Sequence, residues 1–295
     1  MNNNKGSISV IFVIILSLLI GFVGLATDYG YSVIKDLELT NAIDAATLAA
    51  AQDLDDVYTA RETANEYLVK NGVDPLDVII TFSDNNTSIK LESVRDVENR
   101  FMKVFNIDTT EIKASAKVSI RPVYKVTGGI KPFGVADREL IYGDEIVLKS
   151  GANGTLLTGN FGALAFGGHG ACVFRYNAIY GYSGTLEVGD EISTEPGNMA
   201  SVINPLRQSM SDDYSTFDNF SEDSKRLWLV PIVNTMDLEG RGVVIIVGFA
   251  QFFVEDIGNQ AGQTNITGRF VKRVISGVSG DAQLDYGAYS ATLVE

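Results

Sequence analysis

The 295-residue chain carries 37 acidic and 23 basic residues, giving a formal net charge of −14 at pH 7, and 45% of it is hydrophobic. This hydrophobic content is enough for a sizeable core, and the acidic balance argues against binding to phosphate backbones, so we expect no nucleic-acid partner. His169 and Cys172 are the only residues of their types. An intramolecular disulfide and a Cys/His metal cluster within one chain are therefore excluded.

The first predicted element is an apolar helix over residues 8–26, a run of 19 uncharged positions. At ~1.5 Å per residue this helix would be ~28 Å long, close to the hydrocarbon thickness of a bilayer. Lys5 precedes the run and Asp28 follows it, which favours a cytoplasmic N-terminus and an exported C-terminal part. A cleaved secretory signal ending at residues 24–26 is the alternative, but the run is longer than the usual signal core. We expect a single-pass anchor in the cell membrane.

From Leu39 onward, apolar residues spaced by three or four predict one amphipathic helix that ends at Asn71-Gly72. Small side chains on this helix would let a second backbone approach closely. That second backbone belongs either to the sheet of the same domain or to a helix of a neighbouring subunit. The predicted helix-packing positions are Ala42, Ala46, Ala49 and Ala50.

A small antiparallel sheet is predicted next. Alternating runs at 77–83 and 87–93 flank a turn at 84–86, and a strand is predicted over 112–126. Between them, residues 94–106 are predicted to be helical. The sheet and the preceding helix make a pilin-like α+β unit.

The chain after Val126 is rich in glycine and in short apolar runs, which predict a β-rich region with one helix near 200–210. The predicted fold class is α+β: an N-terminal transmembrane helix continuing into a pilin-like helix on a small antiparallel sheet, followed by a β-rich domain. The predicted domains are a cytoplasmic stub and anchor (1–27), a pilin-like domain (28–126) and a β-rich exported domain (127–295). The predicted strands are 141–149, 163–166, 173–176, 185–188, 227–233, 243–254 and 266–274.

The sequence contains no motif for catalysis. It lacks a phosphate-binding loop and a Gly-x-Ser-x-Gly elbow. His169 and Cys172, three positions apart, would point to opposite faces of an extended segment and so would not form a dyad. The acidic stretch 212–223 suits a solvated loop, with a calcium site as the alternative. We expect no enzyme activity, no cofactor and no catalytic or metal-binding residue.

The N-terminal part resembles the TadE/TadG-like Flp (tight adherence) pilus assembly family. The resemblance covers roughly the first 55 residues and combines an apolar span, an aspartate after it and a second aspartate inside an alanine run. The residues that carry it are Gly6, Asp28, Asn41, Asp44, Ala45 and Ala46. Residues 131–134, 159–162 and 194–198 resemble the glycine-rich region of TadG-related proteins of Gram-positive bacteria.

This resemblance implies a membrane-anchored accessory component or minor pilin of a Tad pilus system, at the cell surface and without enzymatic activity. Its partners would be the membrane and other Tad pilus assembly proteins or pilin subunits. Ile11 stands where prepilin-like members carry glutamate, so prepilin cleavage after Gly6 is not implied. An exported binding module unrelated to pili and an exported peptidase-like enzyme are the alternatives.

Overall fold

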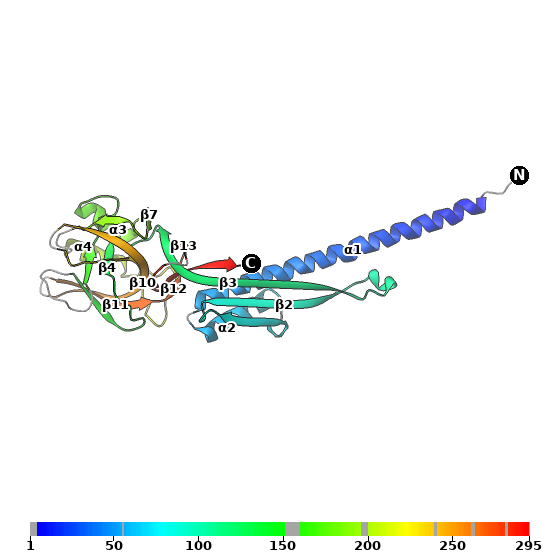
Figure 1. Ribbon diagram of the computed structural model, residues 1–295, viewed down its shortest axis with the longest axis horizontal. Coiled ribbons are helices and arrows are strands. Elements are labelled where there is room, and N and C mark those ends of the chain that lie inside the picture. The colour runs from blue at the N-terminus through cyan, green and yellow to red at the C-terminus, as the bar shows by residue number, and fades with distance from the viewer. Residues whose placement is uncertain are drawn as a thin grey trace. The chain divides into compact units, whose positions relative to one another are not determined.

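The computed structural model describes residues 5–54, 56–150, 160–195, 200–238, 241–260, 263–280 and 283–294. The chain forms two compact units, one of Met1–Ser119 with Thr292–Glu295 and the other of Ile120–Ala291. A long N-terminal helix and antiparallel strands make up the first unit, and strands dominate the second (Figure 1). The predicted α+β class with a β-rich C-terminal region is thus confirmed.

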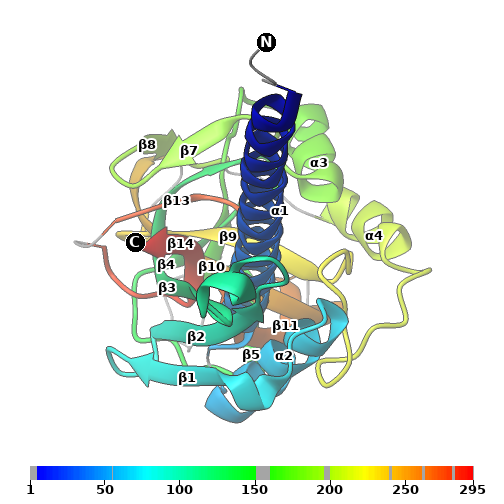
Figure 2. The same ribbon diagram turned by 90° about the vertical axis from the view of Figure 1, so that its right-hand side faces the viewer.

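Helix α1 (Lys5–Ala50) is continuous over 46 residues. Its N-terminal half exposes nearly all of its apolar side chains, whereas its C-terminal half contacts helix α2 (Val57–Lys70) and strand β2 (Ser88–Glu98). Both elements lie along this half of α1 in Figures 1 and 2. The buried positions on α1 recur every three or four residues, as expected for one packed helix face.

The single helix predicted up to residue 71 is wrong, because the chain turns between α1 and α2. A 3-10 turn, η1 (Ala51–Asp53), ends α1, and the Asp56 carboxylate then caps α2 by accepting a hydrogen bond from the Tyr58 amide at 3.0 Å. The two helices contact each other, so each has apolar residues spaced by three or four on the face turned to the other. The apolar spacing therefore continues across the turn and does not reveal it. The predicted end is correct: Asn71 caps α2 and Gly72 takes a φ of 74°.

The predicted hairpin is confirmed. Strand β1 (Val78–Ser83) pairs antiparallel with β2, and the turn residues 84–86 all have positive φ. Strand β2 also pairs antiparallel with β3 (Thr109–Thr127), in a register running from Ser88 opposite Ser119 to Glu98 opposite Thr109. A 3-10 turn, η2 (Pro75–Asp77), leads from α2 into β1.

The helix predicted over 94–106 is wrong. Residues 94–98 continue β2, and only η3 (Met102–Phe105), a single 3-10 turn, is helical. Pairing with β3 continues to Glu98, so ladder hydrogen bonds outweigh the local helical pattern. The β2–β3 connection is therefore a short loop.

In the second unit, six strands pair in a closed ring, in the order β11-β5-β6-β4-β9-β10 with β10 returning to β11. Closure leaves no free edge among these six strands, which protects the unit from edge-to-edge association. The ring strands are β4 (Phe133–Ala136), β5 (Ile146–Ser150), β6 (Asn160–Ala163), β9 (Leu227–Val233), β10 (Val243–Gln260) and β11 (Gln263–Val271).

Shorter elements flank the ring. Strand β8 (Glu191–Ser193) pairs with β10, while β7 (Thr185–Glu187) and β13 (Val278–Ser279) pair with the last residues of β3. Strand β12 (Arg273–Val274) pairs in parallel with β14 (Ala288–Val294). Helix α4 (Ala200–Ser209) lies where a helix was predicted, but the strand predicted at 173–176 is wrong, because helix α3 (Ala171–Tyr180) contains it. Four residues are too few for periodicity to separate strand from helix.

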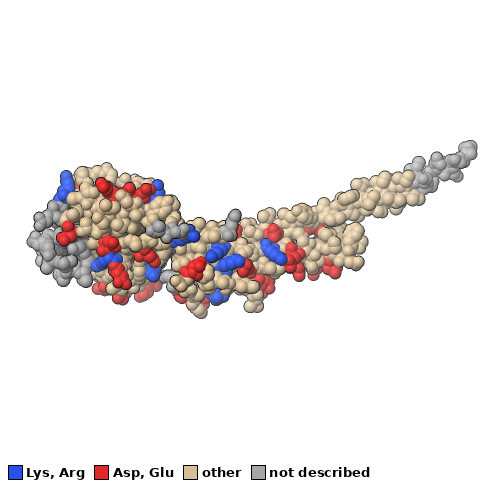
Figure 3. Space-filling view, in the orientation of Figure 1, with Lys and Arg blue, Asp and Glu red and all other residues tan. Residues whose placement is uncertain are grey.

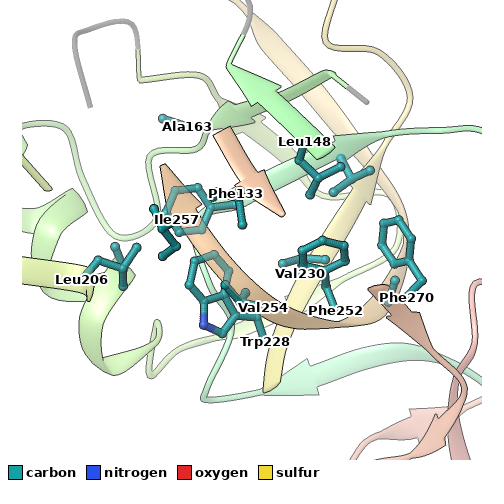
Figure 4. Packing of buried hydrophobic residues seen from close by; sticks show 14 of the residues in the cluster. Phe133, Leu148, Ala163, Leu206, Trp228, Val230, Phe252, Val254, Ile257 and Phe270 are labelled. Carbon is teal, nitrogen blue, oxygen red and sulfur yellow. The ribbon is translucent and has the colours of Figure 1, made fainter. Parts of the chain in front are cut away.

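The core of the second unit is aromatic. Phe133 stacks on Trp228 with ring centroids 5.1 Å apart and contacts Phe174 edge-on at 5.6 Å. Phe252 and Phe270 form a second pair at 4.9 Å. Figure 4 shows the rings of Phe133, Trp228, Phe252 and Phe270 gathered with aliphatic side chains. The core residues come from segments far apart in the chain, so this unit depends on long-range packing.

We expect Ala46→Leu to lower the free energy of unfolding of the first unit by ~1–3 kcal/mol, because enlarging a packed side chain forces its neighbours to move. Ala46 is fully buried on the half of α1 that contacts α2 and β2. Thermal unfolding of the full chain in detergent, followed by far-ultraviolet circular dichroism, measures the effect. Leu48→Phe enlarges an exposed side chain two residues away and is the matched control. Equal melting of the Ala46→Leu variant and the control would contradict this packing.

Candidate functional site

The residues of the predicted motif are spread along α1. Gly6 lies in its first turn, Asp28 is buried, Asn41 is exposed, Asp44 and Ala45 are half-buried and Ala46 is fully buried. Asp28 and Asp44 are 16 residues apart, which corresponds to ~24 Å of helix, so they do not form one acidic site. The motif thus marks a helix with distinct contacts along its length.

Asp28 holds the β2–β3 loop against α1. Its carboxylate accepts hydrogen bonds from the backbone amides of Phe101 and Met102 at 2.7 Å each, and the Arg100 amide lies 3.1 Å from both carboxylate oxygens. The Asp28 residue is only 3% exposed. Three consecutive amides at the start of η3 would otherwise lack helical partners, so this carboxylate acts as a cap supplied from a distant element.

One turn before Asp28, Gly24 lets the same loop approach the helix closely. A Cβ atom at Gly24 would lie 2.8 Å from both Cβ and Cγ of Phe101, which is shorter than a normal contact. Gly24 and Asp28 therefore form one docking point for the loop.

The sequence gives only a weak signal for this docking point. Asp28 has no basic residue three or four positions away on the helix that could pair with it. Its partner must therefore belong to another element of the fold. Its backbone partners lie more than 70 residues later in the chain, beyond the reach of any local pattern. Asp28 is therefore recognisable in the sequence as a motif residue, but not as the residue that caps this loop.

The predicted packing alanines lie on the C-terminal half of α1. Ala42, Ala46 and Ala50 are buried and Ala49 is half-buried. Their assignment as the helix-packing surface remains a prediction. The opposite face carries a second set of apolar residues, which sequence analysis did not single out. This set, here called the outer stripe, consists of Val33, Ile34, Leu37 and Leu48, and all four are exposed.

An open groove of about 500 Å³ lies between α1 and β2 in the first unit. Several of its charged side chains have partners: Lys35 pairs with Glu38 at 2.7 Å, and the Arg100 guanidinium lies over the Tyr31 ring at 5.8 Å. Paired charges of this kind suit a surface groove better than a site with a free nucleophile.

Lys131 adjoins an open pocket of about 450 Å³ in the second unit. Burial lowers the pKa of Lys131 from 10.5 to about 8, so its ammonium group is still mostly charged at neutral pH. Its Nζ donates hydrogen bonds to the carbonyl oxygens of Ala178 at 3.0 Å and Ile179 at 2.7 Å, near the end of α3. A cation at the C-terminal end of a helix stabilises it, which gives Lys131 a structural role.

His169 and Cys172 are arranged differently from the prediction. Cys172 is exposed in the first turn of α3 rather than in an extended segment. His169 Nδ1 lies 2.9 Å from an oxygen of Glu195, so its close partner is a carboxylate and not the thiol. The pair has no geometry that would activate the thiol.

Three carboxylates of the acidic stretch, those of Asp212, Asp213 and Glu222, have partners within the second unit. Asp212 pairs with Lys225 at 2.7 Å, and the Asp213 carboxylate accepts hydrogen bonds from the Ser224 hydroxyl and the Ser215 amide. These hydrogen bonds lower the pKa of Asp213 despite the opposing effect of desolvation. In the part of the chain that the structure describes, no three His, Cys, Asp or Glu residues gather as metal ligands would.

The most specific feature is therefore α1 itself. It is the one helix among the described residues that is long and apolar enough to cross a membrane, with a mean hydropathy of 2.8 in its most apolar window. Figure 3 shows its described N-terminal part free of charged side chains on the visible face. This helix suggests a membrane-anchored protein.

Comparison with known families also points to a membrane-anchored protein. The sequence model of the family described as Putative Flp pilus-assembly TadE/G-like matches residues 6–53. This match confirms the resemblance to TadE/TadG-like proteins over α1 and η1, and it suggests association with a membrane and with pilus components. No curated protein and no solved structure matches the chain.

The matched segment ends before α2, so the second unit lies outside it. The narrower likeness of the glycine-rich segments to TadG-related proteins of Gram-positive bacteria remains a prediction. Of these segments, positions 159 and 196–198 lie outside the described residues.

We expect Asp28→Asn to release the β2–β3 loop from α1, because a neutral amide accepts backbone hydrogen bonds more weakly than a carboxylate does. Hydrogen exchange of the amides of residues 100–102 should accelerate, while exchange in β1 stays unchanged. Mass spectrometry of the full chain in detergent measures both. Asp36→Asn, a half-buried acid two turns further along α1, is the matched control. Unchanged protection at 100–102 would show that the carboxylate does not hold the loop.

Proposed function

We propose that the protein is a membrane-anchored accessory component or minor pilin of a Tad-type pilus assembly system. The observation that carries this proposal is the family match over residues 6–53, which coincides with the one described helix able to cross a membrane. A non-enzymatic role accords with the ion pair between Asp212 and Lys225 in the acidic stretch. It also accords with a matched family whose description concerns pilus assembly.

We infer that the N-terminus is cytoplasmic and that the chain after residue 27 is exported. Lys5 lies before the apolar run and Asp28 after it, and basic residues favour the cytoplasmic side. Under this topology the predicted pilin-like domain (28–126) emerges directly from the membrane. The β-rich domain (127–295) follows it outside the cell.

The outer stripe is the surface of α1 that we assign to other pilus components. The alanine-rich face is already buried within the first unit, so it is not free to contact another subunit. The outer stripe and the apolar span belong to the same helix, α1. A partner helix could therefore pack against the span and the outer stripe together. Exposed apolar residues gathered on one helix face are typical of an interaction surface.

We expect a reporter fused after residue 295 to be active only outside the cytoplasm and to stay with membranes after an alkaline wash. The reason is that one apolar span, entered from the side of Lys5, places everything after it on the far side. Fractionation and reporter activity in intact cells provide the measurement. A soluble, shortened protein that begins near Thr27 would instead establish a cleaved signal.

We expect Leu37→Asn to reduce pilus number by on the order of tenfold in a deletion strain complemented with the variant, because a polar side chain in the centre of an apolar interface weakens it by at least ~1.4 kcal/mol. Protein level and melting temperature should stay unchanged, since Leu37 is 57% exposed. The control is Val69→Asn on α2, which removes a similarly exposed apolar side chain. If the deletion strain itself makes normal pili, the pilus assignment is wrong. Normal pili with Leu37→Asn alone would reject only the outer stripe.

A further inference from the structure

The loop that joins β2 to β3, residues 99–108, lies beside the end of the apolar span. Phe101 contacts Gly24, which is within the uncharged run, and Asp28 fixes the amides of the same loop just after that run. Helix and loop belong to one compact unit. The height of the loop along α1 is therefore set by two independent contacts.

The loop exposes large apolar side chains. Val104 is 82% exposed and Phe105 is 62% exposed, and Phe101 and Ile107 are also exposed. Four such residues within seven positions, at the tip of a hairpin, would be costly in water. Their place at the end of an apolar span offers them a non-aqueous environment.

The charge of the loop is opposite to that of the rest of the protein. Within residues 99–108 the two basic residues, Arg100 and Lys103, outnumber the single acidic residue, Asp108 at the end of the loop. The protein otherwise has an acidic surface that anionic lipid headgroups would repel, so this loop is one place where basic groups stand apart from that excess. Lys103 has one ion-pair partner, Glu98 at 3.4 Å, which precedes the loop.

Two neighbouring residues of the loop, Phe101 and Arg100, lie on opposite sides of Asp28 along α1. Phe101 packs at Gly24, ~6 Å from Asp28 toward the span, while the Arg100 guanidinium lies over Tyr31, ~4.5 Å from Asp28 away from it. Elements that lie in a bilayer interface have this polarity, with apolar side chains toward the acyl chains and cations toward the headgroups.

We propose that the 99–108 loop is a second membrane contact, which inserts Phe101, Val104 and Phe105 into the interface of an anionic phospholipid bilayer beside the end of the α1 span. The proposal rests on the membrane anchoring put forward under Proposed function. It goes beyond that anchoring by assigning lipid contact to a loop outside the matched segment, which ends at residue 53.

The test uses the full chain, with Cys172→Ser removing its only thiol, reconstituted into vesicles of phosphatidylcholine and phosphatidylglycerol. Single cysteines at Val104, Leu16 and Leu76 are labelled with an environment-sensitive fluorophore. Leu16 lies in the apolar span, and Leu76, 92% exposed in η2 of the same unit, is the matched control. Lipids that carry a nitroxide near the headgroup and lipids that carry one in the middle of the acyl chain are used in parallel, so that both depths are probed. Quenching by these lipids is compared with quenching by aqueous iodide.

We expect the label at 104 to emit at shorter wavelength than the label at 76, to be quenched by the nitroxide lipid and to be protected from iodide. A label at 104 that behaves like the label at 76, while the label at 16 is quenched by lipid, would overturn the loop insertion and leave the anchor intact. Protection from iodide without lipid quenching would mean that the loop contacts a second protein copy, which also overturns the proposal. Failure of lipid quenching at 16 would overturn the anchor and the insertion together.

Discussion

The first unit depends on one buried carboxylate. Asp28 stands where the apolar run of α1 ends, and it binds three consecutive amides of a loop that follows it by more than 70 residues. A buried acid is costly unless donors surround it, and here the donors are backbone groups that themselves need an acceptor. The Asp28 carboxylate and the loop amides thus satisfy each other's need for hydrogen bonds. This contact fixes the hairpin of β2 and β3 at one height on α1.

The two halves of helix α1 expose different surfaces, although the helix is continuous. Its first half exposes apolar side chains in nearly every direction, as a helix surrounded by lipid would, whereas its second half buries one face against α2 and β2. The change falls at Gly24 and Asp28, where the loop first touches the helix. Ala42, Ala46 and Ala50 are buried on this second half.

Local patterns in the sequence were sufficient for the span, the hairpin at 84–86 and β9, which runs from Leu227 to Val233 as predicted. They failed where a contact from elsewhere decides the conformation. Residues 94–98 became strand because β3 pairs with them, and the stripe from Leu39 to Leu68 concealed a turn because α1 and α2 contact each other. The docking of the loop on Asp28 could not be predicted for the same reason. Its hydrogen-bond donors are backbone amides, which nearly every residue has, so no residue type marks them in the sequence.

A protein held in a membrane by the α1 span alone moves more freely than one held by the span and the 99–108 loop together. A single helix can shift along the bilayer normal and tilt in any direction at a modest cost, and either motion would change the height of the outer stripe at Val33 and Leu37 above the membrane. A loop that also enters the interface beside Gly24 would limit both motions, because its apolar side chains would leave the lipid when the helix rose or tilted away from the loop. The outer stripe would then stay at a constant height above the membrane. If the outer stripe meets neighbouring helices of a pilus system, as proposed, a fixed height lowers the entropic cost of each encounter. Asp28 would in this way link the depth of the loop to the height at which the helix presents its exposed face.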